Sequence, residues 1–262
     1  LEANTENLRI SIWHESRCQK KSMSIRKIPE YLRFDHMTLI ESRYAPESII
    51  NLLENSVSAH LSIVVGGQPH AGKTELVKYL TTKIPHNEKA GVYEDNQEIH
   101  YRKINPNKKC VEFFVDDKIT YPDIIKAGLR HNIDWILLSE SRGPEVAHLL
   151  NSLSTGSYCM TTMHLDDVRD TPDRMYNMLG SSNINERFIN SIYKYIDLVI
   201  LIECDKHEKR HIKQVGFLSR ENGNNQCTVI YEDGSFTDEK IPETIINKFS
   251  KKGIMNIYEK VN

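Results

Sequence analysis

One segment of the chain combines residue types and spacing that can bind phosphate. It reads Gly67-Gln68-Pro69-His70-Ala71-Gly72-Lys73-Thr74 and is followed by Glu75. The segment satisfies the pattern G-x-x-x-x-G-K-[ST], in which backbone N–H groups of the loop and of the next helix surround phosphate oxygens. Lys73 supplies a positive charge for the β- and γ-phosphates, and the Thr74 hydroxyl can ligand Mg²⁺. These residues therefore predict a binding site for a nucleoside triphosphate and its magnesium ion.

The residues that flank this loop predict the strand and the helix that the motif requires. An apolar run at residues 61–65 has the character of a buried strand. Behind the loop, Leu76, Leu80 and Ile84 recur at helical spacing. The order strand, loop, helix places the helix N-terminus against the phosphates, which is the arrangement that gives the motif its function.

Acidic residues follow two other predicted strands at the positions where a nucleotide hydrolase needs them. Glu94 and Asp95 end the strand at residues 90–93, and Glu140 ends the apolar run at residues 133–138. In open α/β sheets, ligands bind beyond the carboxyl ends of the strands. One carboxylate can hold the Mg²⁺ shell, and another can orient or deprotonate the attacking water. A solvated strand terminus is the alternative for each acid.

Three further polar residues have both a structural and a functional interpretation. His164 ends the strand at residues 158–163, where a histidine is either a structural residue or a group that contacts phosphate. Arg142, two residues after Glu140, is a surface charge by default, and its functional interpretation is a residue that binds the nucleotide. Arg130, at a predicted helix end, would by default stabilise the helix dipole.

The composition describes an ordinary soluble protein with a sizeable core. The 262 residues are 39% hydrophobic and 27% charged, which fits one large domain or one domain with an appended piece. A net charge of -2 argues against a mainly electrostatic interaction with nucleic acid, so we expect no direct nucleic-acid binding. No apolar run is long enough to span a bilayer, and we find no signal peptide. The five dispersed cysteines predict free thiols in a reducing cytosol.

One spacing resembles a metal site, namely Cys204-x-x-His207-x-x-x-His211. It offers three ligands, whereas a structural zinc site normally needs a fourth. The segment is also polar throughout. We therefore interpret it as a turn between two strands.

The remaining pattern predicts an α/β fold after a short N-terminal part. Residues 8–13 and 23–28 resemble two short strands, so we expect residues 1–45 to be the end of a smaller domain with its linker. From residue 46 to 262, helices alternate with strands, which implies a mostly parallel sheet covered on both faces. The pair Asn222-Gly223 marks a turn between two late strands. Beyond the segments above, we expect helices at residues 46–53, 120–130, 144–153, 168–179, 185–195 and 242–249, and strands at 111–115 and 196–202.

Taken together, these segments resemble the traffic ATPases of type II and type IV secretion, and most closely the tight-adherence (Flp-type) pilus and conjugation branch. The loop is similar to the Walker A segment of that family, and residues 94–98 to its Asp box. Residues 136–145 are similar to its Walker B segment with the following G-E-x-R-G sequence. Residues 154–156 and 161–164 are similar to its His box. Residues 24–27 resemble the linker strand, and the likeness extends over about residues 8–215.

The resemblance implies a RecA-like P-loop motor, preceded by a small domain, that forms a ring-shaped homo-hexamer and uses ATP and Mg²⁺. It implies a cytoplasmic protein at the inner face of the cell membrane, beside an inner-membrane component of a secretion or pilus machine. In that family, Glu94 would activate water, Glu140 would be the Walker B acid and His164 would sense the γ-phosphate. Arg26, Arg102 and Arg130 become the candidates for nucleotide contacts from the linker or a neighbouring subunit, and the resemblance does not decide among them.

The chain also departs from the family pattern. Gln68 and His70 replace glycines usual in the family loop, and Ser139 replaces the glycine before the Walker B glutamate. Because glycine permits a positive φ that a side chain resists, we expect slower turnover or altered nucleotide affinity. The zinc-binding tetracysteine element of the type II branch is absent from the sequence, which favours the other branch.

Three functions follow from these observations. The leading one is an ATP-hydrolysing motor for a secretion, pilus-assembly or conjugation system. The second is an assembly scaffold that binds nucleotide but turns over little or none, which the altered loop motivates. The third is a small-molecule phosphotransferase, against which the His-box similarity argues.

Overall fold

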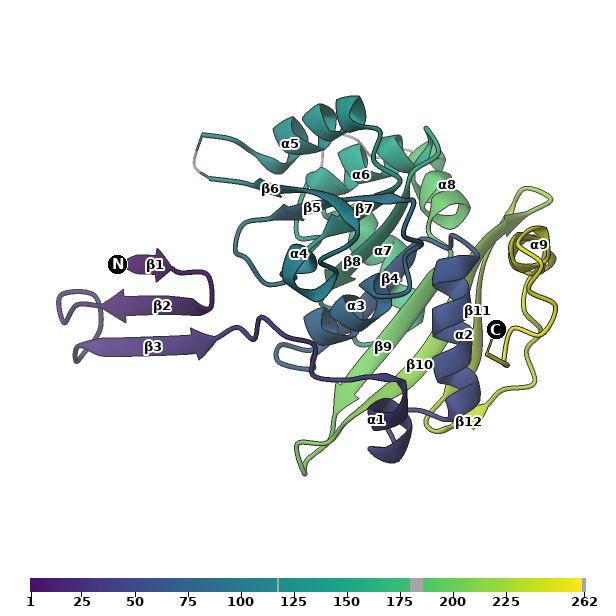
Figure 1. Ribbon diagram of the computed structural model, residues 1–262, viewed down its shortest axis with the longest axis horizontal. Helices are drawn as coiled ribbons and strands as arrows, with labels where there is room; N and C mark the ends of the chain where they lie inside the picture. Colours follow the sequence, from purple (N-terminus) through teal and green to yellow (C-terminus); the bar gives the residue numbers. More distant parts are fainter. Residues whose placement is uncertain (117, 180–185, 261–262) are drawn as a thin grey trace.

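The computed structural model describes residues 1–116, 118–179 and 186–260. It contains a nine-stranded sheet with helices on both faces and a separate three-stranded sheet at the N-terminus. Figure 1 shows the small sheet standing beside the larger body and joined to it by an extended segment. The α/β fold with a mostly parallel sheet is therefore confirmed.

The strands divide into the two sheets in chain order. The N-terminal sheet contains β1 (Glu2–Asn4), β2 (Leu8–Trp13) and β3 (Ser22–Lys27). The large sheet contains β4 (Ile63–Gly67), β5 (Lys89–Glu94), β6 (Lys109–Phe114), β7 (Trp135–Leu138), β8 (Tyr158–Met163), β9 (Leu198–Cys204), β10 (Arg210–Glu221), β11 (Asn224–Glu232) and β12 (Ser235–Phe236).

The helices mostly connect consecutive strands of the large sheet. They are α1 (His36–Glu41), α2 (Glu47–Ser58), α3 (Lys73–Thr81), α4 (Tyr101–Ile104), α5 (Tyr121–Gly128), α6 (Glu145–Leu153), α7 (Thr171–Asn177), α8 (Glu186–Tyr195) and α9 (Glu243–Lys251). Two 3₁₀ turns, η1 (Leu129–His131) and η2 (Val168–Asp170), extend the chain beside α5 and α7.

The strand order brings the predicted site residues to one edge of the sheet. The order is β12-β11-β10-β9-β4-β8-β7-β5-β6. From β9 to β6 all neighbouring strands are parallel, whereas β10, β11 and β12 are antiparallel. The loop strand β4 lies between β9 and β8. The carboxyl ends of β4, β5, β7 and β8 therefore meet at one edge, where the rule for open α/β sheets puts ligands.

Alternating side chains of the central strands divide the core into two layers. In β4, Ile63 and Val65 join the layer beneath α2 and α3, and Val64 joins the layer beneath α5, α6 and α8. All three are fully buried. Because successive side chains of a strand point to opposite faces, a continuous apolar run is what a strand covered on both faces needs.

Most predicted elements agree with the structure, including the helix start at Thr120. Its backbone N–H donates to Asp123 Oδ2 at 3.0 Å, as in a capping box. The predicted turn at Asn222-Gly223 joins β10 to β11. The strands β1 and β12 and the short helices α1 and α4 were not predicted. The predicted helix at 168–179 is η2 followed by α7, and residue 185 lies outside the described residues.

The last helix, which we expected to pack on an edge strand of the sheet, covers a face of the sheet instead. Helix α9 contacts β10, the third strand of the sheet order. Its residues Ile245 and Phe249 are buried in the layer that α2 also covers. Figure 1 shows α9 beside the antiparallel part of the sheet. It therefore covers a face of this part, because its two apolar residues need a surface that an edge does not offer.

The segment between the two sheets packs on the larger body. Leu39 of α1 is fully buried, and Tyr44 O accepts a hydrogen bond from Ile212 N at 2.8 Å. We propose that the N-terminal domain and linker end near residue 45. Among the residues that the structure describes, no helix has the length and apolar character to cross a lipid bilayer.

Candidate functional site

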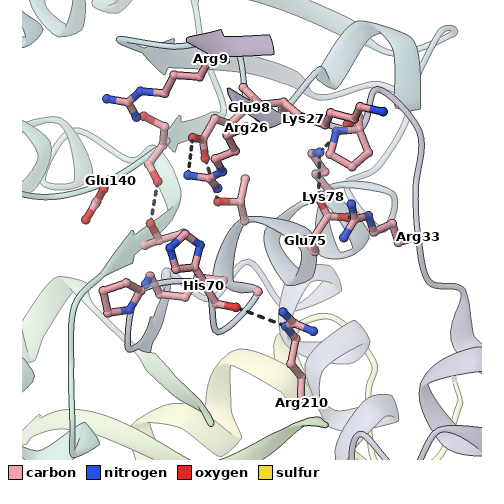
Figure 2. Close-up of a pocket in the computed structure, with 18 of the residues that line it drawn as sticks. Arg9, Arg26, Lys27, Arg33, His70, Glu75, Lys78, Glu98, Glu140 and Arg210 are labelled. Carbon is pink, nitrogen blue, oxygen red and sulfur yellow. Dashed lines mark hydrogen bonds and ion pairs between the residues drawn. The ribbon is translucent and has the colours of Figure 1, made fainter. Parts of the chain in front are cut away.

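A cavity of about 450 Å³ opens at the carboxyl edge of the sheet. Its walls come from two sources that Figure 2 shows facing each other. The phosphate-type loop, α3 and the ends of β7 and β8 form one wall, and β2, β3 and the linker form the other. The cavity therefore lies between the large sheet and the N-terminal sheet, with the predicted loop at its base.

The backbone of the loop takes the conformation that the glycine pattern predicts. Gly67 has φ 149°, and a Cβ built there would lie 2.5 Å from Ile202 O. Gly72 has φ 95° and is the N-cap of α3. Both positions favour glycine because of their positive φ, and Gly67 also requires it because of the close approach to Ile202 O. His70 also has a positive φ, of 63°, although it carries a side chain.

Lys73 lies at the centre of the loop. Its Nζ donates to Gly67 O and Gln68 O at 2.9 Å each and lies 3.5 Å from His164 Nδ1. Burial lowers the pKa of Lys73, and the Glu140 carboxylate opposes this shift. The ammonium group thus links the loop to the end of β8, where a transferred phosphoryl group can reach both residues.

Glu140 is the hub of a charged network at the ends of β7 and β8. One carboxylate oxygen lies 3.0 Å from His164 Nε2, and the other accepts from Arg142 Nε at 2.6 Å. Arg142 Nη1 also donates to Asp95 Oδ2 at 3.1 Å. The Glu140 side chain is 15% exposed. The structure therefore brings Glu140, His164, Arg142 and Lys73 together at one edge of the sheet, and their functional roles stay predictions.

Glu98 is an acid of this site that the sequence analysis did not single out. Its Oε2 accepts a hydrogen bond from Thr74 Oγ1 at 3.3 Å, and its Oε1 lies 3.5 Å from Arg26 Nη1. Figure 2 shows this pair with Arg26 reaching over from β3. The signal was present, because Glu98 lies four residues after Glu94 in the same Asp-box segment.

Glu94 ends β5, as predicted, but its side chain is buried. It does not line the cavity, and its Oε1 accepts hydrogen bonds from the backbone N–H groups of Glu98 at 3.0 Å and Ile99 at 2.9 Å. The side chain is 2% exposed, and burial raises the pKa of Glu94 to about 8. The carboxyl group therefore holds the turn that presents Asp95 and Glu98. This geometry favours a structural role for Glu94 over the activation of water.

Two of the predicted arginines are not at the cavity of this chain. Arg102 lies 3.6 Å from Glu112 and faces a smaller cavity of about 130 Å³ that it shares with Glu94. Arg130 is exposed in η1, just before β7 begins, and so lies toward the opposite edge of the sheet. Within one chain, neither residue contributes to the site.

The structure adds cationic residues that sequence reasoning missed. The cavity lining among the described residues contains eight cationic side chains and four carboxylates, a positive balance suited to a triphosphate. Register explains one addition, because Arg9 pairs with Arg26 across β2 and β3. That pairing follows from aligning the two predicted strands. The added cations are Arg9, Lys27, Arg33, Lys78 and Arg210.

The donor set suits Mg²⁺ held with a nucleotide rather than a protein-only metal site. Among the described residues, no group of three or more His, Cys, Asp or Glu side chains could hold a metal ion. Mg²⁺ typically takes one or two protein oxygens together with waters and substrate phosphates. The Thr74 hydroxyl and the Glu140 carboxylate, with Glu98 beside Thr74, can supply these oxygens.

The Cys204, His207 and His211 segment forms the turn that the sequence predicted. It joins β9 to β10, and Asp205 Oδ1 accepts hydrogen bonds from the backbone N–H groups of His207 at 2.8 Å and Lys209 at 2.9 Å. Backbone contacts of Asp205 therefore determine the shape of this turn.

Comparison with known proteins supports the fold and identifies a matching family. The sequence model of a family described as "Type II/IV secretion system protein" matches residues 2–257. An uncharacterized protein of Bacillus anthracis is 26% identical over 246 residues, which are 88% of this chain and 55% of that protein. The chain spans about half the length of the curated relatives it matches.

Two solved structures share the fold. The VirB11 ATPase from the Brucella suis type IV secretion system, in complex with sulphate, has a TM-score of 0.58 and 24% identity. The match covers 83% of this chain and 75% of that chain. The pilus retraction motor PilT with bound ADP has a TM-score of 0.59 and 16% identity, over 98% of this chain and 68% of that chain. The predicted RecA-like fold is thereby confirmed.

Proposed function

The chain belongs to the type II/IV secretion system protein family, and we propose from this that it is an ATP-hydrolysing motor of a secretion, pilus-assembly or conjugation system. One observation carries the proposal. The loop lysine Lys73, the hydroxyl of Thr74 and the strand-end residues Glu98, Glu140 and His164 all line one cavity of about 450 Å³. These are the group types that phosphoryl transfer to water requires.

Each residue has a task that its position supports. Loop N–H groups and Lys73 bind the β- and γ-phosphates, and His164 contacts the γ-phosphate from the end of β8. Thr74 and Glu140 would hold Mg²⁺, partly through water, and the ion would neutralise charge on the phosphates. Glu98 accepts a proton from the attacking water or orients it, in place of the role expected for Glu94.

The N-terminal sheet and linker supply charge from the other wall. Arg26 and Arg9 face the same cavity from neighbouring strands, so they can bind phosphate oxygens when the two walls approach. ATP binding would favour the closed arrangement, and hydrolysis would release it. Arg102 and Arg130, which do not reach the cavity of their own chain, would act on a neighbouring subunit of a ring hexamer.

We further propose that the motor acts in the cytoplasm at the inner face of the cell membrane, beside a membrane component of its machine. Direct binding of nucleic acid is not expected. The proposed location rests on the family. The expectation about nucleic acid rests on the net charge of the chain, which is close to neutral at -2.

Phosphate release, measured together with mass in solution, tests the function. Wild-type protein should hydrolyse ATP, and Lys73→Ala should lower the rate by roughly 100-fold or more, because it removes the positive charge that stabilises the transferred phosphoryl group. Lys206→Ala, in the turn before β10, is the matched control and should retain the wild-type rate. Normal turnover in Lys73→Ala would contradict the role of Lys73.

A scaffold that binds nucleotide without turnover is the second candidate. The positive φ of His70, at a position where glycine is usual in the family, favours it. A scaffold should show a rise in thermal midpoint with Mg·ATP but no phosphate release. Phosphate release that Lys73→Ala abolishes would exclude this candidate.

A further inference from the structure

The loop contains one residue whose backbone conformation is unusual for its type. His70 has φ 63°, in the left-handed region that disfavours residues with a Cβ atom. Strain of this kind persists only where surrounding contacts hold the residue in place. The neighbours of His70 should therefore include a group that stabilises this conformation.

Arg210 is that group, and it comes from a strand that no phosphate-loop motif includes. It begins β10, and its Nε donates a hydrogen bond to His70 O at 3.2 Å. A Cβ built at Gly72 would lie 3.1 Å from Arg210 Cδ, so the side chain lies along the loop over more than one residue. Figure 2 shows Arg210 pointing at the carbonyl of His70.

Two other carbonyls of the loop also accept hydrogen bonds from a side chain. Lys73 takes Gly67 O and Gln68 O, each at 2.9 Å. The Gln68 side chain donates to Asp166, which lies two residues after His164. The loop is thus held from the β8 side by Asp166 and from the β10 side by Arg210. These side-chain contacts use carbonyl groups rather than the loop N–H groups that can bind an anion, of which Ala71 N donates to Gln68 O at 3.2 Å.

We propose that Arg210 is a positioning residue that holds His70 in its left-handed conformation and so pre-organises the loop for nucleotide phosphates. A glycine at position 70 would adopt the positive φ freely. With histidine there, the charge-assisted hydrogen bond from Arg210 stabilises the same conformation. The proposal rests on the proposed nucleotide function. Its distinguishing consequence is that the importance of Arg210 depends on which residue occupies position 70.

A double-mutant cycle tests this dependence. Arg210→Ala is made with His70 present and again in a His70→Gly background, and Mg·ADP affinity is measured for each protein by calorimetry. Arg210→Ala alone should weaken binding about tenfold, the usual worth of a hydrogen bond to a charged group. In the His70→Gly background, it should weaken binding by about twofold or less, because glycine adopts a positive φ without strain.

Two controls make the result specific. Lys209→Ala, one residue earlier in the turn, should keep the wild-type affinity. Arg210→Lys should recover part of the lost affinity, since an ammonium group can make one bond to the carbonyl. An equal loss from Arg210→Ala in both backgrounds would overturn the proposal, because Arg210 would then act on the nucleotide itself or on another contact.

The same cycle is also measured as a thermal midpoint without nucleotide. Arg210→Ala should lower the midpoint more when residue 70 is histidine than when it is glycine. Equal shifts would overturn the proposal even if the protein bound no nucleotide. Failure of wild-type protein to bind Mg·ADP would instead contradict the proposed function, so the two failures are distinguishable.

Discussion

The two walls of the cavity are built differently. The wall formed by the large sheet holds its groups with backbone and side-chain contacts, and Glu140 and Lys73 are 15% and 9% exposed. The opposite wall comes from β3 and the linker, where Arg26 and Arg33 are about half exposed, at 49% and 51%. All residues of β3 are exposed.

Few contacts join the second wall to the first. Arg26 pairs with Glu98, and Lys103 Nζ lies 3.0 Å from Glu6 Oε1. In addition, Lys78 Nζ donates to Pro29 O at 2.8 Å. Exposed ion pairs contribute little free energy, and salt screens them. The difference indicates that the sheet wall is held more firmly than β3, and we propose that β3 approaches the sheet wall when nucleotide binds. Variants of the first should therefore affect turnover most.

The largest effect is expected at the hub of the sheet wall. Glu140→Gln keeps the size of the side chain but removes the charge that holds Mg²⁺ and pairs with Arg142 and His164. Turnover should fall by roughly 100-fold or more, with Mg·ADP affinity changed by less than about tenfold. Phosphate release measures the turnover, and calorimetry measures the Mg·ADP affinity. Unchanged turnover would remove Glu140 from the mechanism.

A comparison of Glu94 and Glu98, two acids of one segment, tests which of them acts in turnover. Glu98→Gln should lower turnover by roughly 100-fold, because Glu98 faces the cavity beside Thr74. Glu94→Gln should stay within about threefold of wild type, since its amide oxygen can still accept from the backbone of Glu98 and Ile99. The reverse order of effects would restore the original assignment of Glu94 as the water-activating group.

The linker wall should show a smaller effect that depends on salt. Arg26→Ala should lower turnover by about tenfold at low ionic strength and by less at high ionic strength, because the residue is half exposed. Arg17→Ala, between β2 and β3, is the matched control and should have no effect. A loss as large as that of Glu140→Gln would show that the linker wall is as fixed as the sheet wall.

The smallest effect concerns the stability of the sheet wall as pH changes. The pKa of Glu94 is raised to about 8 from 4.5, so folding favours its protonated form. The stability that this provides is fully present below pH 4.5 and is lost as pH rises through about 8, by a few kcal/mol at most. Denaturant unfolding at pH 5 and pH 9 should show a smaller decrease for Glu94→Gln than for wild type. Equal decreases in the two proteins would contradict the shift.

The sequence predicted the residues at the ends of the parallel strands better than Arg210, for physical reasons. Lys73, Thr74, Glu140 and His164 follow strands in a parallel sheet, so their meeting at one edge needs only the strand assignment. Arg210 comes from an antiparallel strand that is distant in sequence, and its contact with His70 depends on tertiary packing. The local spacing of residues in the sequence does not predict such a contact.

The same reasoning explains why the sequence favoured Glu94, whereas the geometry favours Glu98. Both acids belong to the segment after β5, and only the direction of the turn decides which one is buried. That turn is set by the hydrogen bonds from Glu98 and Ile99 to Glu94. These are backbone donors, which no pattern of side-chain types reveals.

A crystal structure with Mg²⁺ and a non-hydrolysable ATP analogue tests the central claim most directly. The account predicts the γ-phosphate within hydrogen-bonding distance of Lys73 and His164, with Mg²⁺ at Thr74. The Glu98 carboxylate should face the phosphates, and Arg26 should have moved toward them. Density for the triphosphate at any other cavity, or a loop that binds it with Lys73 turned away, would contradict the account.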